Sequence, residues 1–439
     1  MDKEYLPGLV LFVLACMFLA FLVGVLVAIF RVTPYATIKA AVSNVAMIIS
    51  ESRNDSTLKD LHFAYKARND DSGVTVLKDD QVQPGVTLVT GIWKVNDTWG
   101  PEIRIIDLAG KTLHSWKIHP EKIWPDSPHQ DWARNSHNKP HGYVHGTALL
   151  PDGDIIFNIE YLTTVRMDAC GNIKWKLPMR NHHSVFEDDD GNFWVSGLIW
   201  REKAIDRFPH LKPPFVDETL VKLSPDGEVL REISILDVLY NSGYQATVDM
   251  NENIYDVTHM NDVEILSNDL ADKFPMFNAG DILVSLRKYS MVLVIDGESE
   301  QVKWHFRHPL IQQHDPDFEP DGRIVIFDNN DDTTRDGSLW GATQILSVDP
   351  VNKTYERLYP TSPDQKLYTK EGGKHQLLAN GNRLITEANA GRLLEVTPAG
   401  ELVWNWVIES REGGYIPEVL EGSRYPLKSV DFTSTLSCR

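Results

Sequence analysis

Five histidines occupy the same place relative to five short turns centred on glycine. Each precedes its turn along the chain, and each turn leads into a run of β-branched or aromatic residues; the histidines are His145, His183, His259, His314 and His375. Imidazoles gathered at one point could bind a metal ion, bind an anion, or serve as nucleophile and proton carriers. A scatter of 15 histidines along the chain would not be expected to give such a pattern.

Two further residues favour an anion over a metal ion at this place. Arg287 follows the apolar run Ile282–Leu286, where packing gives no reason for a cation. Asn261, two residues after His259, faces the same side of its strand and can donate a hydrogen bond. Positive charge and donors without a clear carboxylate ligand suit an oxyanion better than Zn²⁺. We therefore predict chemistry that needs neither a metal nor another cofactor.

The turns belong to a repeat that predicts the fold. A second kind of turn leads into a strand that ends at a tryptophan or at its equivalent, Leu230 or Tyr355, and it recurs at Gly110, Gly171, Gly227, Gly297, Asn352 and Gly400. Successive copies are 48 to 70 residues apart. Two hairpins in each repeat give four strands, and six such repeats predict an all-β, six-bladed β-propeller. The strand before the first kind of turn would then be innermost, and the five histidines would rim the central channel. The alternative is a long β-sandwich or two stacked sheets.

The amino-terminal part of the chain differs from the repeats. Residues 5–30 carry no charge, and a helix of this length is long enough to span the ~30 Å hydrocarbon core of a bilayer. We predict a transmembrane anchor over residues 1–31, a helical stalk and linker over 32–83, and the propeller over 84–439. The expected localisation is a single-pass membrane protein with its propeller on the extracytoplasmic, periplasmic side.

The composition excludes some partners. Lys and Arg number 43 against 62 Asp and Glu, a formal net charge of −19 that would repel phosphate backbones, so no nucleic-acid partner is expected. Three cysteines are too few for a disulfide framework. Cys170 and Cys438 could pair in an oxidising compartment, and the sequence leaves that pairing open.

Several segments resemble the bacterial-type aryl sulfotransferases, which use aryl sulfate esters in place of a nucleotide sulfate. The similarity extends from about Thr147 to Trp406 and is most specific in three places: His182–His183, the segment 259–287 with its His-Met-Asn-Asp start, and the segment 313–329 with its Gln-His-Asp start. This resemblance also implies a six-bladed propeller, in agreement with the repeat count.

The resemblance implies a role for each matching residue. His314 corresponds to the covalent nucleophile, and the matching anion-binding residues are His183, His259, Asn261 and Arg287. The expected reaction transfers a sulfuryl group from an aryl sulfate to a phenol, through a sulfo-histidine and with ping-pong kinetics. His183 or His259 would exchange protons with the phenol oxygen. His145 and His375 would line the channel.

Two other functions remain open. The predicted anchor and stalk would suit a propeller that acts as a binding or assembly module within a membrane complex. Asp315 and Asp317 follow His314 and could help to hold a metal ion, so a metal-bound or quinone-dependent oxidoreductase is a third possibility.

Overall fold

The computed structural model describes residues 6–30, 57–125, 129, 142–250, 256–434 and 436–438, apart from residues 62, 69, 71, 96, 97 and 335. Two compact units are present: residues 1–56 with 135–137, and residues 57–134 with 138–439. The second unit thus begins at Thr57, well before the predicted boundary at residue 84, because strands from residues 64–77 complete its sheets.

The first unit contains one described element, helix α1 (Leu6–Phe30). Its side chains are described for residues 12–26, and all of them are exposed. Within the described part of the chain, no helix has the length and apolar character needed to cross a membrane. Of the predicted stalk and linker (32–83), residues 32–56 lie outside the described residues. The membrane anchor therefore stays a prediction.

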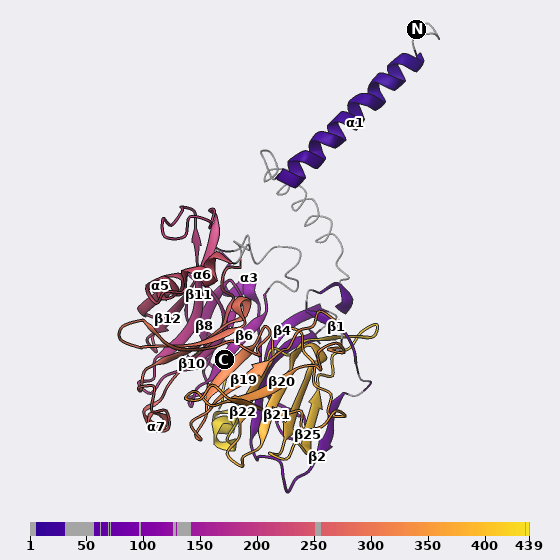
Figure 1. Cartoon of the computed structure of the whole chain (residues 1–439). Coiled ribbons are helices and arrows are strands. Elements are labelled where there is room, and N and C mark those ends of the chain that lie inside the picture. The colour runs from indigo at the N-terminus through magenta and orange to yellow at the C-terminus, as the bar shows by residue number, and fades with distance from the viewer. Residues whose placement is uncertain are drawn as a thin grey trace. The chain divides into compact units, whose positions relative to one another are not determined.

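The second unit is an all-β, six-bladed propeller, as predicted (Figure 1). Blades are numbered here in ring order, and strands are given from the innermost outward. Blade 1 contains β27 (Glu421–Tyr425), β3 (Val86–Val95), β4 (Thr98–Ile106) and β5 (Thr112–Lys117). Blade 2 contains β6 (Val144–Leu149), β7 (Ile155–Ile159), β8 (Thr163–Met167) and β9 (Ile173–Lys176). Blade 3 contains β10 (Arg180–Glu187), β11 (Phe193–Arg201), β12 (Phe215–Leu223) and β13 (Val229–Ser234).

The other three blades follow the same plan, and neighbouring strands in every blade are antiparallel. Blade 4 contains β14 (Met260–Ile265), β15 (Ile282–Leu286), β16 (Met291–Ile295) and β17 (Val302–Phe306). Blade 5 contains β18 (His314–Phe318), β19 (Ile324–Asp328), β20 (Gln344–Val348) and β21 (Tyr355–Tyr359). Blade 6 contains β22 (Lys374–Leu377), β23 (Arg383–Glu387), β24 (Arg392–Val396), β25 (Leu402–Val407) and a fifth strand, β2 (Gly73–Leu77).

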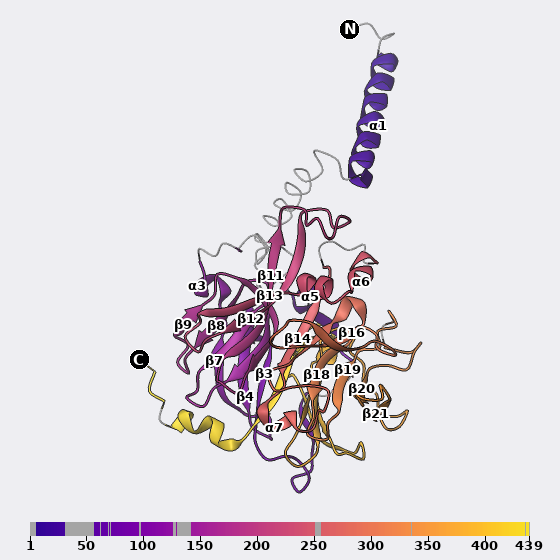
Figure 2. The same cartoon turned by 60° about the vertical axis from the view of Figure 1, so that its left-hand side comes forward.

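Short elements fill the connections between the strands. A two-stranded sheet joins β1 (Ala64–Lys66) to β26 (Tyr415–Pro417). The described helical segments of the propeller unit are η1 (Leu58–Asp60), α3 (Pro120–Ile123), α5 (Ile235–Asn241), α6 (Gln245–Asp249), α7 (Asn268–Ala271), η3 (Arg287–Tyr289), η4 (Ala388–Ala390) and η5 (Leu427–Ser434). Helix η5 is the yellow segment near the C-terminus in Figure 2.

The ring closes because distant parts of the chain share blades 1 and 6. The C-terminal strand β27 pairs with β3, and the early strand β2 pairs with β25. A disulfide between Cys170, in the β8–β9 turn, and Cys438 ties the C-terminal tail to blade 2. The pairing that the sequence left open is therefore present. In blades 2 to 6, one of the five turns that follow the histidines joins the innermost strand to the second strand. Blade 1 lacks such a turn because its innermost strand, β27, comes from the C-terminal end of the unit.

Each contact between neighbouring blades has its own apolar core. Six clusters of buried side chains lie between blades 1 and 2, 2 and 3, 3 and 4, 4 and 5, 5 and 6, and 6 and 1. The repeated tryptophans link the blades at their outer strands. Each indole donates to a carbonyl in the outer turn of the next blade: Trp116 to Asp168, Trp175 to Pro225, Trp304 to Pro350 and Trp404 to Leu108. The tryptophan recurs in the sequence because this contact recurs in the ring.

Candidate active site

The innermost strands of blades 2 to 5 are irregular where they begin. β6, β10, β14 and β18 each show a register shift against the second strand of their blade within a few residues of their histidine. His183 and His259 have φ values of 53° and 48°, and Asp315 after His314 has 46°. Non-glycine residues rarely adopt such angles, and they often mark functional sites. These bulges allow consecutive side chains to face the channel.

Four of the five histidines lie close together at the end of the channel where the innermost strands begin. The ring of His183 lies 4.3 Å from that of His145, 5.3 Å from His259 and 6.5 Å from His314, measured between centroids. The same four side chains line a cavity of about 290 Å³. The structure therefore brings together His145, His183, His259 and His314.

His375 does not join them. It is fully buried in β22, accepts a hydrogen bond from Arg383 (Nη1–Nδ1 3.0 Å) and lies 3.3 Å from the carboxylate of Asp317. It lines neither the cavity nor the narrow channel beneath it. The physical reason is the regular pairing of β22 with β23, in which His375 falls opposite Ile385 without a bulge. Lys374 faces the channel in its place.

His314 is held in one tautomer. Its Nδ1 lies 2.6 Å from Oδ1 of Asn329. The amide nitrogen of Asn329 donates to the carbonyls of Thr369 (3.0 Å) and Gly372 (2.8 Å), so its Oδ1 must be the acceptor for His314. Nδ1 of His314 therefore carries the proton, and Nε2 keeps its lone pair. A neutral imidazole with a free Nε2 is a nucleophile.

Arg287 lines the same cavity and has no acidic partner among the described residues. Its Nε is buried without a hydrogen-bond acceptor. Its backbone N–H donates to the carbonyl of His259 (3.0 Å), which fixes the end of β15 beside the histidines. A guanidinium with open donors in a cavity is suited to a tetrahedral oxyanion.

Asn261 lies on the next section of the channel, beneath the histidines. Here His145, His183 and His314 line a space of about 20 Å³ together with Asn261 and Lys374. The Asn261 amide donates to the carbonyl of Gln313 (2.9 Å), the residue before His314, and its Oδ1 is buried without a described partner. The structure places it against His314 but not in the cavity lining that contains Arg287.

The buried histidines are kept neutral. Burial, and next the charge of Arg287, lower the pKa of His314 well below its usual value. Burial and the neighbouring rings lower the pKa of His183 well below that value as well. Burial lowers the pKa of His145 to about 3, with smaller effects from Lys374 and His259. A neutral His314 is the form that can attack an electrophile.

A carboxylate supports the ring of His259. His259 Nδ1 lies 2.9 Å and 3.0 Å from the two oxygens of Asp256, which Lys288 also contacts at 3.0 Å. His183 shares a short Nδ1–Nδ1 contact of 2.6 Å with His182, and His182 Nε2 lies 3.6 Å from Glu218. The carboxylate of Asp256 can therefore stabilise the positive charge of a protonated His259 ring.

The rest of the cavity is formed by residues that the sequence analysis did not single out. They are Phe63, Gly142, Tyr143, Glu160, Tyr161, Glu371, Gly372, Glu418 and Leu420. None falls on the repeating position of the histidines: Glu160 and Tyr161 follow β7, and the others come from segments between strands. The sequence carries no periodic signal that would have found them.

Two groups of described residues have the composition of a metal site. His145, Glu160 and His183 form one group in the cavity, and Asp315, Asp317 and His375 form another on the inner strands β18 and β22; in each, the potential ligand atoms lie within 4.8 Å of one another. In the second group, the side chain of His375 already accepts from Arg383, whose positive charge would oppose a cation. The predicted alternative of a metal at Asp315 and Asp317 gains no support from this arrangement.

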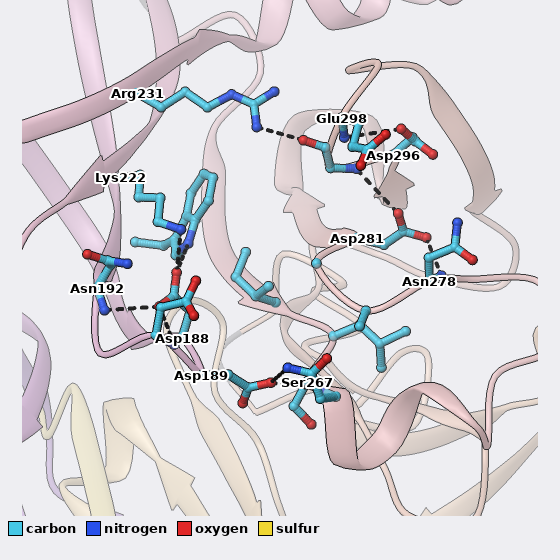
Figure 3. A pocket seen from close by; sticks show the side chains of 18 of the residues that line it. Asp188, Asp189, Asn192, Lys222, Arg231, Ser267, Asn278, Asp281, Asp296 and Glu298 are labelled. Atoms are coloured by element: carbon cyan, nitrogen blue, oxygen red, sulfur yellow. Dashed lines mark hydrogen bonds and ion pairs between the residues drawn. The ribbon is translucent and has the colours of Figure 1, made fainter.

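A larger groove of about 870 Å³ lies at the opposite ends of blades 3 and 4, around the turns before β11, β15 and β17 (Figure 3). Several of its carboxylates are used in local contacts. Asp188 pairs with Lys222 (2.8 Å), Asp281 with Lys303 (2.7 Å), and Asp189 accepts from the backbone of Asn268 (2.6 Å). The groove lacks the open cation and the nucleophile of the histidine cavity.

Comparison with known proteins identifies a family. The family profile described as "Arylsulfotransferase (ASST)" matches residues 146–410. No curated protein matches the chain. Among solved structures, a protein of unknown function from Bacteroides caccae is 13% identical, with a TM-score of 0.49, over 77% of this chain and 98% of that one. A catalytically inactive virginiamycin B lyase from Staphylococcus aureus with quinupristin is 12% identical, with a TM-score of 0.40, over 77% and 89%. The Neurospora crassa Pan2 WD40 domain has the same identity and TM-score over 81% and 90%.

Proposed function

The chain belongs to the arylsulfotransferase family, and we propose that it transfers a sulfuryl group from an aryl sulfate to a phenol through a covalent intermediate on His314. The observation that carries this proposal is the Nδ1 contact of His314 with Asn329, which leaves Nε2 unprotonated in a cavity that also contains Arg287. A nucleophile and an open cation beside it are what transfer of an anionic group requires.

The first half-reaction begins with the donor sulfate beside Arg287. Nε2 of His314 attacks sulfur, the N–S bond forms, and the bond from sulfur to the aryl oxygen breaks. The leaving phenolate takes its proton from a neighbouring imidazolium. Charge spreads over the sulfuryl oxygens in the loose transition state of such transfers, so Arg287 stabilises that state.

The second half-reaction reverses these roles with a new phenol. The phenol proton goes to the imidazole that protonated the leaving phenolate in the first half-reaction. The phenol oxygen attacks sulfur, and the N–S bond to His314 breaks. Of the two candidate proton carriers, His259 is favoured over His183 because the carboxylate of Asp256 accepts from its Nδ1 and would stabilise the charged ring. Donor and acceptor use one site in turn, which gives ping-pong kinetics.

Two observations support an extracytoplasmic, membrane-attached enzyme. The Cys170–Cys438 disulfide would form and persist in an oxidising compartment. The described side chains of α1, including Phe12, Phe18 and Phe21, are exposed and apolar, as those of a lipid-facing helix would be. We propose that α1 anchors the chain and that the propeller lies in the periplasm.

The covalent step is tested by the mass of the full-length chain after brief exposure to 4-nitrophenyl sulfate without an acceptor. Wild type should gain one sulfuryl group, with release of 4-nitrophenol, and peptide mapping should place it on His314. His314→Ala should gain nothing. His305→Ala is the matched control, because His305 is a half-buried histidine on the outer strand β17, hydrogen-bonded to Tyr244. A gain of mass in His314→Ala would overturn the assignment.

A further inference from the structure

The cavity lining is divided by charge according to the order of the blades. Blades 3, 4 and 5 contribute His183, Arg287 and His314, of which Arg287 and His314 are assigned to the sulfuryl group. Blades 6, 1 and 2 complete the ring, and the segments beside their inner strands contribute Glu371, Glu418 and Glu160. One half of the cavity therefore attracts an anion, and the half facing it contains three carboxylates.

Among the described residues, no cation balances these carboxylates. No described lysine or arginine forms an ion pair with Glu160, Glu371 or Glu418. Glu371 accepts from the hydroxyl of Tyr65 (2.7 Å), and one oxygen of Glu418 accepts from Asn389 (3.2 Å). The other oxygen of Glu418 accepts no hydrogen bond from a described residue, although Glu418 is only 2% exposed. Such a group is costly to bury unless a ligand satisfies it.

Their titration agrees with this arrangement. Burial, and next the charge of Glu371, raise the pKa of Glu160 to about 7. Burial and the charges of Glu371 and Glu160 raise the pKa of Glu418 well above its usual range. A positive charge placed among them would favour the ionised carboxylates and release protons.

The space between the two halves suits one aromatic ring. Phe63 and Tyr143 form an edge-to-face pair with centroids 4.2 Å apart at the carboxylate side. Tyr161, the residue after Glu160, also lines the cavity. Aromatic faces of this kind also attract cations. A volume of about 290 Å³ is at the small end of ligand pockets.

We infer that the substrate of this site is a phenol, or its sulfate ester, that carries a protonated amine on a short side chain. This inference rests on the proposed sulfuryl transfer. The sulfate or phenolic oxygen lies at Arg287 and His314, and the ammonium group lies among Glu160, Glu371 and Glu418.

The test compares three acceptors of similar size with 4-nitrophenyl sulfate as donor. 4-Hydroxyphenethylamine is cationic, 4-ethylphenol is neutral and 3-(4-hydroxyphenyl)propionate is anionic. The value of kcat/KM should be highest for the amine, roughly tenfold above 4-ethylphenol for one charged hydrogen bond, and lowest for the propionate. Equal values for all three would overturn the inference while leaving sulfuryl transfer in place. No turnover of any of the three acceptors would instead count against the proposed function.

Isosteric variants locate the preference. Glu418→Gln and Glu160→Gln should each reduce the ratio of kcat/KM between the amine and 4-ethylphenol. Glu356→Gln is the matched control, because Glu356 is exposed on the outer strand β21 and should leave that ratio unchanged. Since Glu160 also belongs to a possible metal group with His145 and His183, the series is repeated in EDTA. Loss of the amine preference in EDTA would overturn the inference in favour of a metal ion.

Binding gives a readout that is independent of catalysis. Phenethylamine lacks the hydroxyl group and cannot accept a sulfuryl group. Calorimetry at pH 7 should show that it binds wild type with release of protons, seen as a dependence of the enthalpy on the buffer, and that it binds Glu418→Gln more weakly. If it binds both proteins equally, or binds neither, the carboxylate half is not an ammonium site.

Discussion

Nδ1 of His314 lies 2.6 Å from Oδ1 of Asn329, on the residue that follows the neighbouring strand β19. The Asn329 amide is oriented by two backbone carbonyls of the segment before β22, so blade 6 sets the tautomer of a histidine in blade 5. The nucleophile is thus prepared by the contact between two blades.

Replacing Asn329 with alanine should lower kcat by roughly 10–100-fold, the usual cost of losing a residue that orients a functional histidine. His314 could then place its proton on Nε2 and lose its nucleophilic lone pair. Asn329→Asp keeps the acceptor and should recover part of the rate. Steady-state kinetics with 4-nitrophenyl sulfate checks this, and a change in KM alone would contradict a role in tautomer selection.

Arg287 should stabilise the transition state more than the fold. Arg287→Gln should lower kcat/KM by about 10²–10³-fold, the typical cost of removing one oxyanion donor. The melting temperature should stay the same or rise, because the side chain has a buried Nε without an acceptor and no acidic partner among the described residues. A variant with lower stability and unchanged kinetics would show that Arg287 is structural.

The repeat, the number of blades and the inner-strand position of the histidines could all be predicted from the sequence, because the same contacts recur in each blade. The error at His375 could also have been avoided. His145, His183 and His314 stand eight residues before their turn glycine, whereas His375 stands six before Gly381. Side chains along a regular strand alternate between its two faces. A bulge shifts this alternation, so the number of residues between a histidine and its turn glycine decides whether the histidine faces the channel.

The carboxylate half could not have been predicted. Glu160, Glu371 and Glu418 come from three different kinds of segment, and only closure of the ring brings them together. The start of the propeller at Thr57 was missed for a related reason. β1 and β2 are short, lie among polar residues, and pair with β26 and β25 more than 300 residues away. Such long-range pairing leaves no local pattern.

His182 should make stability depend on pH in a defined direction. Burial, with the charges of His259 and His145, lowers its pKa to about 3. The unfolded chain binds this proton below about pH 6.5, whereas the native protein does not until about pH 3, so the contribution of His182 is complete above pH 6.5 and declines as the pH falls. We therefore expect the free energy of unfolding in urea to be lower for His182→Gln than for wild type at pH 7.5. This difference should shrink by about 2 kcal/mol between pH 7.5 and pH 5. A deficit that is constant with pH would contradict the buried neutral ring.

Gly146 should be indispensable to the histidine cluster. It follows His145 within the β6 bulge at a φ of 83°, and a Cβ at this position would lie 1.7 Å from the carbonyl oxygen of His183. Gly146→Ala should therefore push blades 2 and 3 apart and abolish turnover while also lowering the melting temperature. Gly191→Ala separates the two causes, because Gly191 has a φ of 75° and open space around its Cβ position. The free energy of unfolding of Gly191→Ala should fall by only about 1 kcal/mol because of backbone strain, and its activity should be kept. Activity in Gly146→Ala equal to that of Gly191→Ala would show that the close approach of the two blades is not needed to align His183 with His314.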